Sequence, residues 1–589
     1  MARMDSVRRK PKDARGTFRR LIAYIGQYKW ILAAVFALCF VSNILALLGP
    51  GLAGSAINEA AAGPGKVRFD RVLYFAERML LCYVSSSVIT IAIHFVMMKV
   101  SRWVARKMRG DVFEKLMRLP VGYFDQNQAG DIISRVSYDI DVVCTCIATD
   151  VVQILTSLVT VIGSFVMMLM LSPMLALVTL VTIPSAIFYT TKMRKITQPR
   201  FAKRSKNYGI MNGFVEEMFG GQKTIMAYAY ENRVAERFDR INMAAADAYY
   251  AADYYGLTMG PTVGFINNIG LGLIAVFGSL LYMWQMITLG QISSFVLYSR
   301  KFSGPINEIA NIVNELYSAL AASERVFALL DEEEELKDKE GAKAPHEVKG
   351  NVALEHVFFG YDREKTIIHD LNLVADAGKL IAIVGPTGAG KTTIINLLMR
   401  FYDVDQGRVL LEGGDIRDYT RAGVRGAYAM VLQETWVFRG TIFENIAYGK
   451  EGATMEEVVA AAKAAHIHSF IMQLPEGYET VISEDGGNIS KGQKQLLTIA
   501  RAMLYDAKMV ILDEATSNVD TGTERRIQKA MRELMKGKTC FVIAHRLSTI
   551  QNADQILVIC QGDVVEQGNH ESLMEKRGFY YRLYAAQFE

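Results

Sequence analysis

The sequence predicts a multi-domain fold, in which an all-α domain of six transmembrane helices precedes an α/β domain. Two observations predict this division. Long apolar runs recur between residues 29 and 310, whereas residues 351–589 alternate strand-like and helical stretches, as water-soluble α/β proteins do. With 589 residues the chain is also too long for a single hydrophobic core.

Six stretches of the first part are long and apolar enough to cross a bilayer, which takes about 20 residues of helix. They are residues 29–50, 78–98, 150–171, 173–193, 256–283 and 287–310. The last stretch is the weakest of the six, because Arg300, Lys301 and Glu308 interrupt it. We therefore expect a transmembrane domain over residues 29–330.

The charges of the loops predict the orientation of these helices. The third and fourth segments, and the fifth and sixth, are joined by short turns, whereas the 2–3 and 4–5 connections are long and rich in Lys and Arg. Basic loops stay on the cytoplasmic side, so both termini of this multi-pass protein of the cell membrane are expected to be cytoplasmic. Residues 1–28 are basic and lack the apolar core of a signal peptide, which predicts a cytoplasmic N-terminus with an elbow helix.

Net charge and cysteine spacing argue against two classes of function. The formal net charge of +4 gives no reason to expect nucleic-acid binding. Cys144 and Cys146 form a C-x-C pair without a second pair, so a zinc site is not expected. The six cysteines are expected to be reduced and structural.

A charged linker and then a different pattern follow the membrane segments. Residues 331–350, beginning with Asp331-Glu-Glu-Glu-Glu335, are weakly apolar and are expected to form an unstructured linker. Apolar runs then predict strands at residues 352–359, 380–384, 509–512 and 540–543. Helical stretches between them indicate a largely parallel sheet in a domain over residues 351–589.

The second of these strands leads into a motif that binds phosphate. Leu380–Val384 is followed by Gly385-Pro386-Thr387-Gly388-Ala389-Gly390-Lys391-Thr392-Thr393, which is G-x-x-x-x-G-K-T ahead of a helix expected over residues 394–401. The glycines allow backbone N–H groups to point at phosphate oxygens, aided by the positive end of the helix. Lys391 is expected to reach the β- and γ-phosphates of a nucleotide, and the Thr392 hydroxyl to bind Mg²⁺.

A second motif supplies carboxylates. The apolar run Met509–Leu512 ends at Asp513-Glu514, as expected of a buried parallel strand whose carboxyl end faces a ligand. Asp513 is expected to hold Mg²⁺, directly or through water. Glu514 is the candidate general base for an attacking water molecule.

With these motifs the chain resembles the ATP-binding cassette (ABC) transporters. Ile489-Ser490-Lys491-Gly492-Gln493 is similar to the L-S-G-G-Q signature of that family and binds ATP by that resemblance. The resemblance further implies that Tyr361 stacks on adenine and that Gln433 senses Mg²⁺ and the attacking water. It implies that Asp520 lies in the loop that crosses to the partner's site and that His545 contacts the γ-phosphate. The catalytic residues expected are thus Glu514, His545 and Gln433.

The resemblance covers the whole chain and implies a half-transporter of the exporter type, similar to bacterial multidrug exporters and lipid flippases. It implies a P-loop ATPase domain with a helical subdomain, and ATP and Mg²⁺ as cofactors. Because each ATP of the family lies between the phosphate loop of one chain and the signature of another, it also implies a dimer. Residues 118–131 and 216–230 are similar to coupling helices, which dock on the ATPase domain. The alternative for each is a plain cytoplasmic turn.

Lys491 departs from the family pattern, since a long cationic side chain stands where glycine permits a close approach. The residues for the chain's own ATP are intact, which favours an asymmetric heterodimer with a second half-transporter. A homodimer that tolerates Lys491 is the alternative. The cargo expected is a hydrophobic or amphipathic molecule, a drug or a lipid. A peptide exporter and a non-transporting regulatory or channel-like protein are the other hypotheses.

Overall fold

A computed structural model describes residues 13–63, 66–362, 365–433, 435–483, 487–513, 520–543 and 550–586. The chain divides into two compact units. We call them the helical unit, which comprises residues up to 119 and residues 127–334, and the α/β unit, which comprises residues 120–126 and 335–589.

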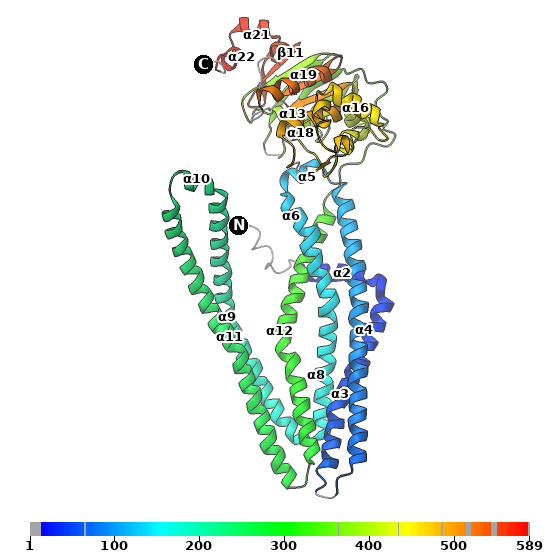
Figure 1. The fold of residues 1–589 in the computed structure, drawn as a ribbon, viewed down its shortest axis with the longest axis vertical. Helices are drawn as coiled ribbons and strands as arrows, with labels where there is room; N and C mark the ends of the chain where they lie inside the picture. Colours follow the sequence, from blue (N-terminus) through cyan, green and yellow to red (C-terminus); the bar gives the residue numbers. More distant parts are fainter. Residues whose placement is uncertain are drawn as a thin grey trace. The chain divides into compact units, whose positions relative to one another are not determined.

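The helical unit is built from long helices joined by short turns (Figure 1). The helices that precede the first long loop are α2 (Ala14–Ile25), α3 (Lys29–Ala60) and α4 (Phe69–Leu116). After them come α6 (Ala129–Ser134), α7 (Ile140–Thr145) and α8 (Val151–Leu171), which are joined by two π-helical turns, Arg135–Asp139 and Cys146–Asp150. The last are α9 (Pro173–Gly220), α10 (Gln222–Ala227), α11 (Glu231–Met283) and α12 (Leu289–Asp331).

The six predicted membrane segments all lie in long helices of this unit. Five continuous helical stretches of the described chain are long and apolar enough to cross a membrane: 14–60, 69–116, 129–171, 173–220 and 231–283. The sixth predicted segment lies in α12, a 43-residue helix. Its charged residues Arg300, Lys301 and Glu308 explain why it is less apolar than the other five.

Helices α3 and α12 are joined by hydrogen bonds in the apolar part of the unit. Lys301 Nζ donates to the Ala46 carbonyl (2.7 Å), the Tyr298 hydroxyl to the Leu47 carbonyl (2.7 Å), and Ser294 Oγ to the Pro50 carbonyl (2.8 Å). Pro50 has no N–H group, so the Ala46 carbonyl lacks its partner four residues on in the helix. The ammonium of Lys301 satisfies this carbonyl, and both polar groups are thereby paired.

A buried ion pair holds α12 against the first π-helical turn. Arg325 donates from Nε to Asp139 Oδ2 (2.8 Å) and from Nη2 to Asp139 Oδ1 (2.5 Å). The side chain of Asp139 is only 4% exposed. Two residues further on, Asp141 pairs with Arg109, but there both side chains are largely in contact with solvent.

Helices α9 and α11 form a long antiparallel pair that carries α10 at its end (Figure 1). The turns around α10 leave apolar side chains in contact with solvent, namely Phe219, Met226, Tyr228 and Tyr230. This tip lies within the second stretch that resembles a coupling helix. The first such stretch contains α5 (Val121–Gln126), which belongs to the α/β unit.

The α/β unit contains the parallel sheet that the sequence predicts. Its six strands have the order β12-β11-β3-β10-β9-β6, and every pairing except β11 with β12 is parallel. The strands are β3 (Leu380–Val384), β6 (Tyr428–Val431), β9 (Met509–Asp513), β10 (Thr539–Ile543), β11 (Gln555–Cys560) and β12 (Asp563–Gly568). β3, β9 and β10 lie where the apolar runs predict them, because strands covered on both faces consist of near-continuous apolar residues.

A second, antiparallel sheet has the order β2-β1-β4-β5 and was not predicted as a separate layer. Its strands are β1 (Val352–Phe359), β2 (Ile368–Ala375), β4 (Gln406–Leu411) and β5 (Gly414–Asp415). A small two-stranded sheet consists of β7 (Gly440–Thr441) and β8 (Val481–Ile482). Before β1, the linker residues Glu335 and Asp338 form ion pairs with Arg421 and Arg425.

Helices cover the parallel sheet and bury two apolar cores. In chain order they are α13 (Lys391–Leu398), α14 (Arg421–Gly426), α15 (Ile442–Ala447), α16 (Met455–Ala464), α17 (His468–Ile471), α18 (Lys491–Tyr505), α19 (Thr521–Met535), α21 (His570–Lys576) and α22 (Phe579–Ala585). α13 begins three residues earlier than the helix predicted from residue 394, because the polar start of that helix belongs to the phosphate loop.

Candidate active site

The predicted phosphate loop joins β3 to α13. Its residues 385–390 leave the carboxyl end of β3, and Gly390 immediately precedes α13 with φ +106°, a left-handed conformation that glycine adopts without strain. A Cβ atom at Gly385 would lie 2.1 Å from the carbonyl oxygen of Ile559 on the neighbouring strand β11. Pro386, Thr387 and Gly388 remain exposed while Ala389 is buried. The loop therefore presents its backbone to solvent at the start of a helix, as phosphate binding requires.

Lys391 is the first residue of α13 and is buried. Its ammonium donates hydrogen bonds to the carbonyl oxygens of Gly385 (2.8 Å) and Pro386 (2.9 Å). Burial lowers the pKa of Lys391, and the charge of Asp513 acts in the opposite direction. The cation is thus held over the loop, in a place where an anionic phosphate would stabilise it further.

The sheet brings the other predicted groups to the same edge. β3, β10 and β9 are parallel neighbours, so their carboxyl ends meet where the phosphate loop begins. Asp513 is the last residue of β9, and Gln433 lies two residues after the end of β6, which pairs with β9. Glu514 follows Asp513 directly, and His545 follows β10 by two residues, but both lie outside the described residues.

Thr392 and Thr393 follow Lys391 in α13 and face different surroundings. Thr392 is exposed, whereas Thr393 is buried and lies near the Tyr361 hydroxyl (3.4 Å). The exposed hydroxyl and the Asp513 carboxylate are oxygen donors of the kind that Mg²⁺ prefers. Among the described residues no group of three or more His, Cys, Asp and Glu gathers.

The signature-like residues form the start of α18. Ser490 caps this helix: its Oγ accepts from the Gln493 N–H (3.3 Å), and Gln493 Oε1 accepts from the Ser490 N–H (2.8 Å). Lys491 is exposed, and Gly492 is buried. Asp520 caps α19, accepting from the Thr523 N–H (2.9 Å). In the described ranges, no hydrogen bond or ion pair joins residues 490–493 to residues 385–393.

Comparisons with known proteins match both units of the chain. The family model of the ABC transporter transmembrane region matches residues 31–306, and that of the ABC transporter matches residues 368–517. An uncharacterized ABC transporter ATP-binding protein of Bacillus subtilis is 41% identical over 582 residues, which are 99% of this chain and 96% of that protein. The chain belongs to the ABC transporter family.

Other members of the family give the type of transporter. A fatty acid ABC transporter ATP-binding/permease protein of Mycobacterium tuberculosis is 45% identical over 81% of this chain and 75% of its own length. An ATP-dependent lipid A-core flippase of Syntrophus aciditrophicus is 33% identical over 82% of this chain and 80% of its own length. A bacterial Atm1-family ABC exporter with ATP bound has 28% identity and a TM-score of 0.73, covering 97% of this chain and 99% of that one. This ABC transporter is a membrane-spanning half-transporter of the exporter type that hydrolyses ATP.

Tyr361 of the transporter lies beside the helix that follows the phosphate loop. Its hydroxyl accepts a hydrogen bond from Asn396 Nδ2 of α13 (2.9 Å). Its ring contacts Phe359 and Tyr402 edge-on, with centroid distances of 5.1 and 5.0 Å. The ring is 42% exposed, so it retains a surface on which a base can stack.

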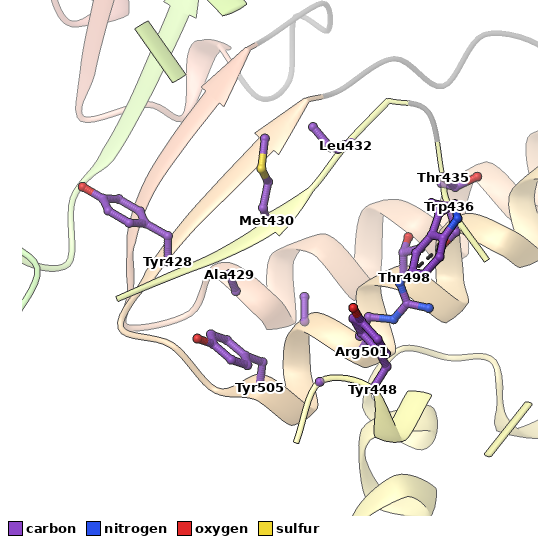
Figure 2. Close-up of a pocket in the computed structure, with 12 residues that line it drawn as sticks. Tyr428, Ala429, Met430, Leu432, Thr435, Trp436, Tyr448, Thr498, Arg501 and Tyr505 are labelled. Atoms are coloured by element: carbon purple, nitrogen blue, oxygen red, sulfur yellow. Dashed lines mark hydrogen bonds between the residues drawn. The ribbon is translucent and has the colours of Figure 1, made fainter. Parts of the chain in front are cut away.

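The structure of the transporter also shows a groove that the sequence did not indicate. It has a volume of about 330 Å³ and lies between β6, α15 and α18 (Figure 2). The guanidinium of Arg501 packs on Trp436 and Tyr448, with distances of 5.6 and 5.2 Å to the ring centroids. Tyr428, Met430 and Tyr505 contribute to the rest of the wall. These residues are distant in sequence and form no motif, so only the folded chain brings them together.

Tyr402 is the second feature that sequence reasoning missed. It follows α13 by four residues, and its role becomes visible only through contacts with Tyr361 and with Asp125, which is 277 residues away.

Proposed function

We propose that the transporter exports an amphipathic molecule, a lipid or a drug that carries an acyl or similar apolar chain. The names of two relatives, a fatty acid transporter and a lipid A-core flippase, concern such amphiphiles. An apolar cavity supports the same class of cargo. It has a volume of about 340 Å³ and is lined by Val161, Ile162, Phe165, Val166, Leu180, Pro184 and Phe302.

This cavity is the observation that carries the proposal. Its walls come from α8, α9 and α12, three helices of the predicted membrane domain, and all of them are apolar side chains. An apolar pocket favours ligand groups without hydrogen-bonding needs, and an acyl chain is such a group. A peptide cargo would bring backbone amides that these side chains leave unpaired.

The experiment measures ATP hydrolysis by the purified transporter in lipid vesicles with and without palmitate. Palmitate is expected to stimulate hydrolysis, and acetate, which shares the carboxylate but lacks the chain, is expected to have no effect. Radiolabelled palmitate is expected to change leaflet with ATP and to stay in place in the Glu514→Gln variant. Stimulation by acetate, or by a water-soluble peptide instead, would contradict the proposed cargo.

We propose that Mg²⁺ and ATP bind at the sheet edge, with Thr392, Asp513 and Gln433 around the metal and Glu514, Gln433 and His545 acting on the water and the γ-phosphate. The cradle of residues 385–393 fits the phosphates, because it offers backbone N–H groups, a helix start and the Lys391 ammonium. The bound Mg²⁺ would neutralise charge on the transferred phosphate. Asp513 is the last residue of β9, and Gln433 follows β6, the strand that pairs with β9. Both residues therefore lie at the same edge of the sheet as the phosphate loop.

We further propose that the working molecule is a dimer with cytoplasmic termini. Residues 490–493 of one chain would complete the ATP site of the other. The groove of Trp436 and Arg501 would receive the exposed α10 tip of the partner, because both surfaces are apolar and aromatic. ATP would close the two sites, and its hydrolysis would reopen them.

Lys491 favours a heterodimer over a homodimer. It is the exposed first residue of α18. In the proposed dimer, residues 490–493 complete the ATP site of the other chain, so the cation of Lys491 would meet the partner's ATP. The chain purified alone is expected to hydrolyse ATP slowly, and Lys491→Gly is expected to raise that rate. Strong hydrolysis by the chain alone, lost in Glu514→Gln and indifferent to Lys491→Gly, would show that a homodimer suffices.

A further inference from the structure

Helix α5 lies in the α/β unit although the sequence on both sides of it belongs to the helical unit. It packs on Tyr402: a Cβ atom at Gly122 would lie 3.1 Å from the ring and the hydroxyl of that tyrosine. Glycine at this position lets the backbone of α5 approach the aromatic side chain. Helix α5 and Tyr402 thus contact each other within the α/β unit.

A charged hydrogen bond fixes this contact. The Tyr402 hydroxyl donates to Asp125 Oδ2 at 2.5 Å, a short distance typical of a hydroxyl bound to an ionised carboxylate. Burial, and then the hydrogen bond to Asp125, raise the pKa of Tyr402. The phenol therefore remains a proton donor over the whole physiological pH range.

The other side of the Tyr402 ring touches the residue expected to stack on adenine. The rings of Tyr361 and Tyr402 meet edge-on at 82°, and the ring of Phe359 lies 5.5 Å from that of Tyr402. Asn396 holds the hydroxyl of Tyr361 (2.9 Å). The orientation of Tyr361 is thus set on one side by Tyr402 and at its tip by α13, while the rest of the ring stays open to a base.

We propose that Asp125 and Tyr402 are positioning residues for ATP, which hold the Tyr361 ring in the orientation that binds adenine and link it to α5. The proposal rests on the assignment of Tyr361 as the stacking residue. If α5 moves away, Tyr402 loses its partner, Tyr361 loses its support, and the affinity for ATP falls. By linkage, bound ATP holds α5 in its place with the same free energy.

The test measures KM for ATP and kcat of the full-length transporter in lipid vesicles for Asp125→Ala, Tyr402→Phe and the double variant. Tyr402→Phe keeps the ring and removes only the hydroxyl. Each single variant is expected to raise KM for ATP roughly three- to tenfold with kcat changed less than about twofold, since one charged hydrogen bond is lost. The double variant is expected to resemble the single ones, because both break the same bond.

Two controls separate the possible outcomes. Asp376→Ala removes an exposed carboxylate of the same unit, in the turn between β2 and β3, and is expected to leave KM unchanged. Tyr361→Ala tests the stacking assignment alone and is expected to raise KM at least as much as Asp125→Ala does. An unchanged KM in Tyr361→Ala would remove the basis of the proposal, without bearing on ATP-driven export. A raised KM in Tyr361→Ala with normal values in Asp125→Ala and Tyr402→Phe, or additive effects in the double variant, would overturn the link itself.

Discussion

At the scale of single residues, the site depends on the buried cation of Lys391. Lys391 is satisfied by two carbonyl oxygens of its own loop, and burial disfavours its charge. A γ-phosphate would offer the ammonium a charged acceptor in place of these neutral carbonyl oxygens. Hydrogen bonds to a charged acceptor are about twice as strong as those to a neutral one. Lys391 is therefore placed to bind the phosphates of a triphosphate through its charge.

Lys391→Met, which keeps the length of the side chain and removes its charge, is expected to lower ATP hydrolysis by about 100-fold or more. Lys379→Met is the matched control, since Lys379 flanks the other end of β3 and pairs with Asp554 in contact with solvent. ATP turnover by the two purified variants is compared in lipid vesicles. Equal activity of the two would show that Lys391 does not act on the phosphates.

The sequence predicted the residues of the phosphate loop and Asp513 because each lies in a local motif at the end of an apolar strand. The neighbours of Tyr361 could not be predicted, because Tyr402 and Asp125 meet only through the packing of α5 within the α/β unit. The same reason hid the groove around Arg501. Local patterns encode strands and loops, whereas contacts between distant segments depend on the folded chain.

At the scale of elements, the π-helical turns between α6 and α8 show how a polar contact sets a helix position. The first turn places Asp139 against Arg325 of α12, whereas Asp141 lies on the exposed side. π-helical turns are often found at functional sites, where they reorient side chains. Here the turn directs a carboxylate into the contact between two long helices.

Asp139→Ala is expected to destabilise the helical unit by about 3 kcal/mol, because it removes the buried carboxylate to which both Nε and Nη2 of Arg325 donate. Asp141→Ala breaks an exposed pair and is expected to cost about 1 kcal/mol or less. Thermal unfolding of the detergent-solubilised variants measures the difference. A similar unfolding temperature for both would mean that the Asp139 pair contributes no more than a surface ion pair.

At the scale of the whole molecule, the charges of the loops predict which ends of the helices face the cytoplasm, and exposed residues at those ends allow a test of this prediction. Met286, in the turn between α11 and α12, and Met226, in α10, are exposed to similar extents, 60% and 62%. The basic residues of the long loops predict that the α10 end is cytoplasmic and the α11–α12 turn external. Under this prediction, the two methionines lie on opposite sides of the membrane.

In intact cells, a membrane-impermeant maleimide is expected to label Met286→Cys but not Met226→Cys, and to label both once the membrane is permeabilised. The parent protein supplies the background, since five of its six cysteines are buried and Cys560 is half-buried. The labelled fraction is read from a gel. The reverse pattern would place the ATP-binding unit outside the cell and contradict the proposed topology.

The bond between Lys301 and the Ala46 carbonyl has a consequence for the history of the sequence. The cation is tolerated among apolar helices because Pro50 leaves a carbonyl free for it, and that carbonyl is tolerated because the cation is there. Loss of the lysine alone would leave that carbonyl unpaired in the bilayer, and loss of the proline alone would make Lys301 share the carbonyl with a backbone N–H group. We therefore expect positions 50 and 301 to have been exchanged together during the divergence of related transporters, so that a relative without the proline would also lack the lysine.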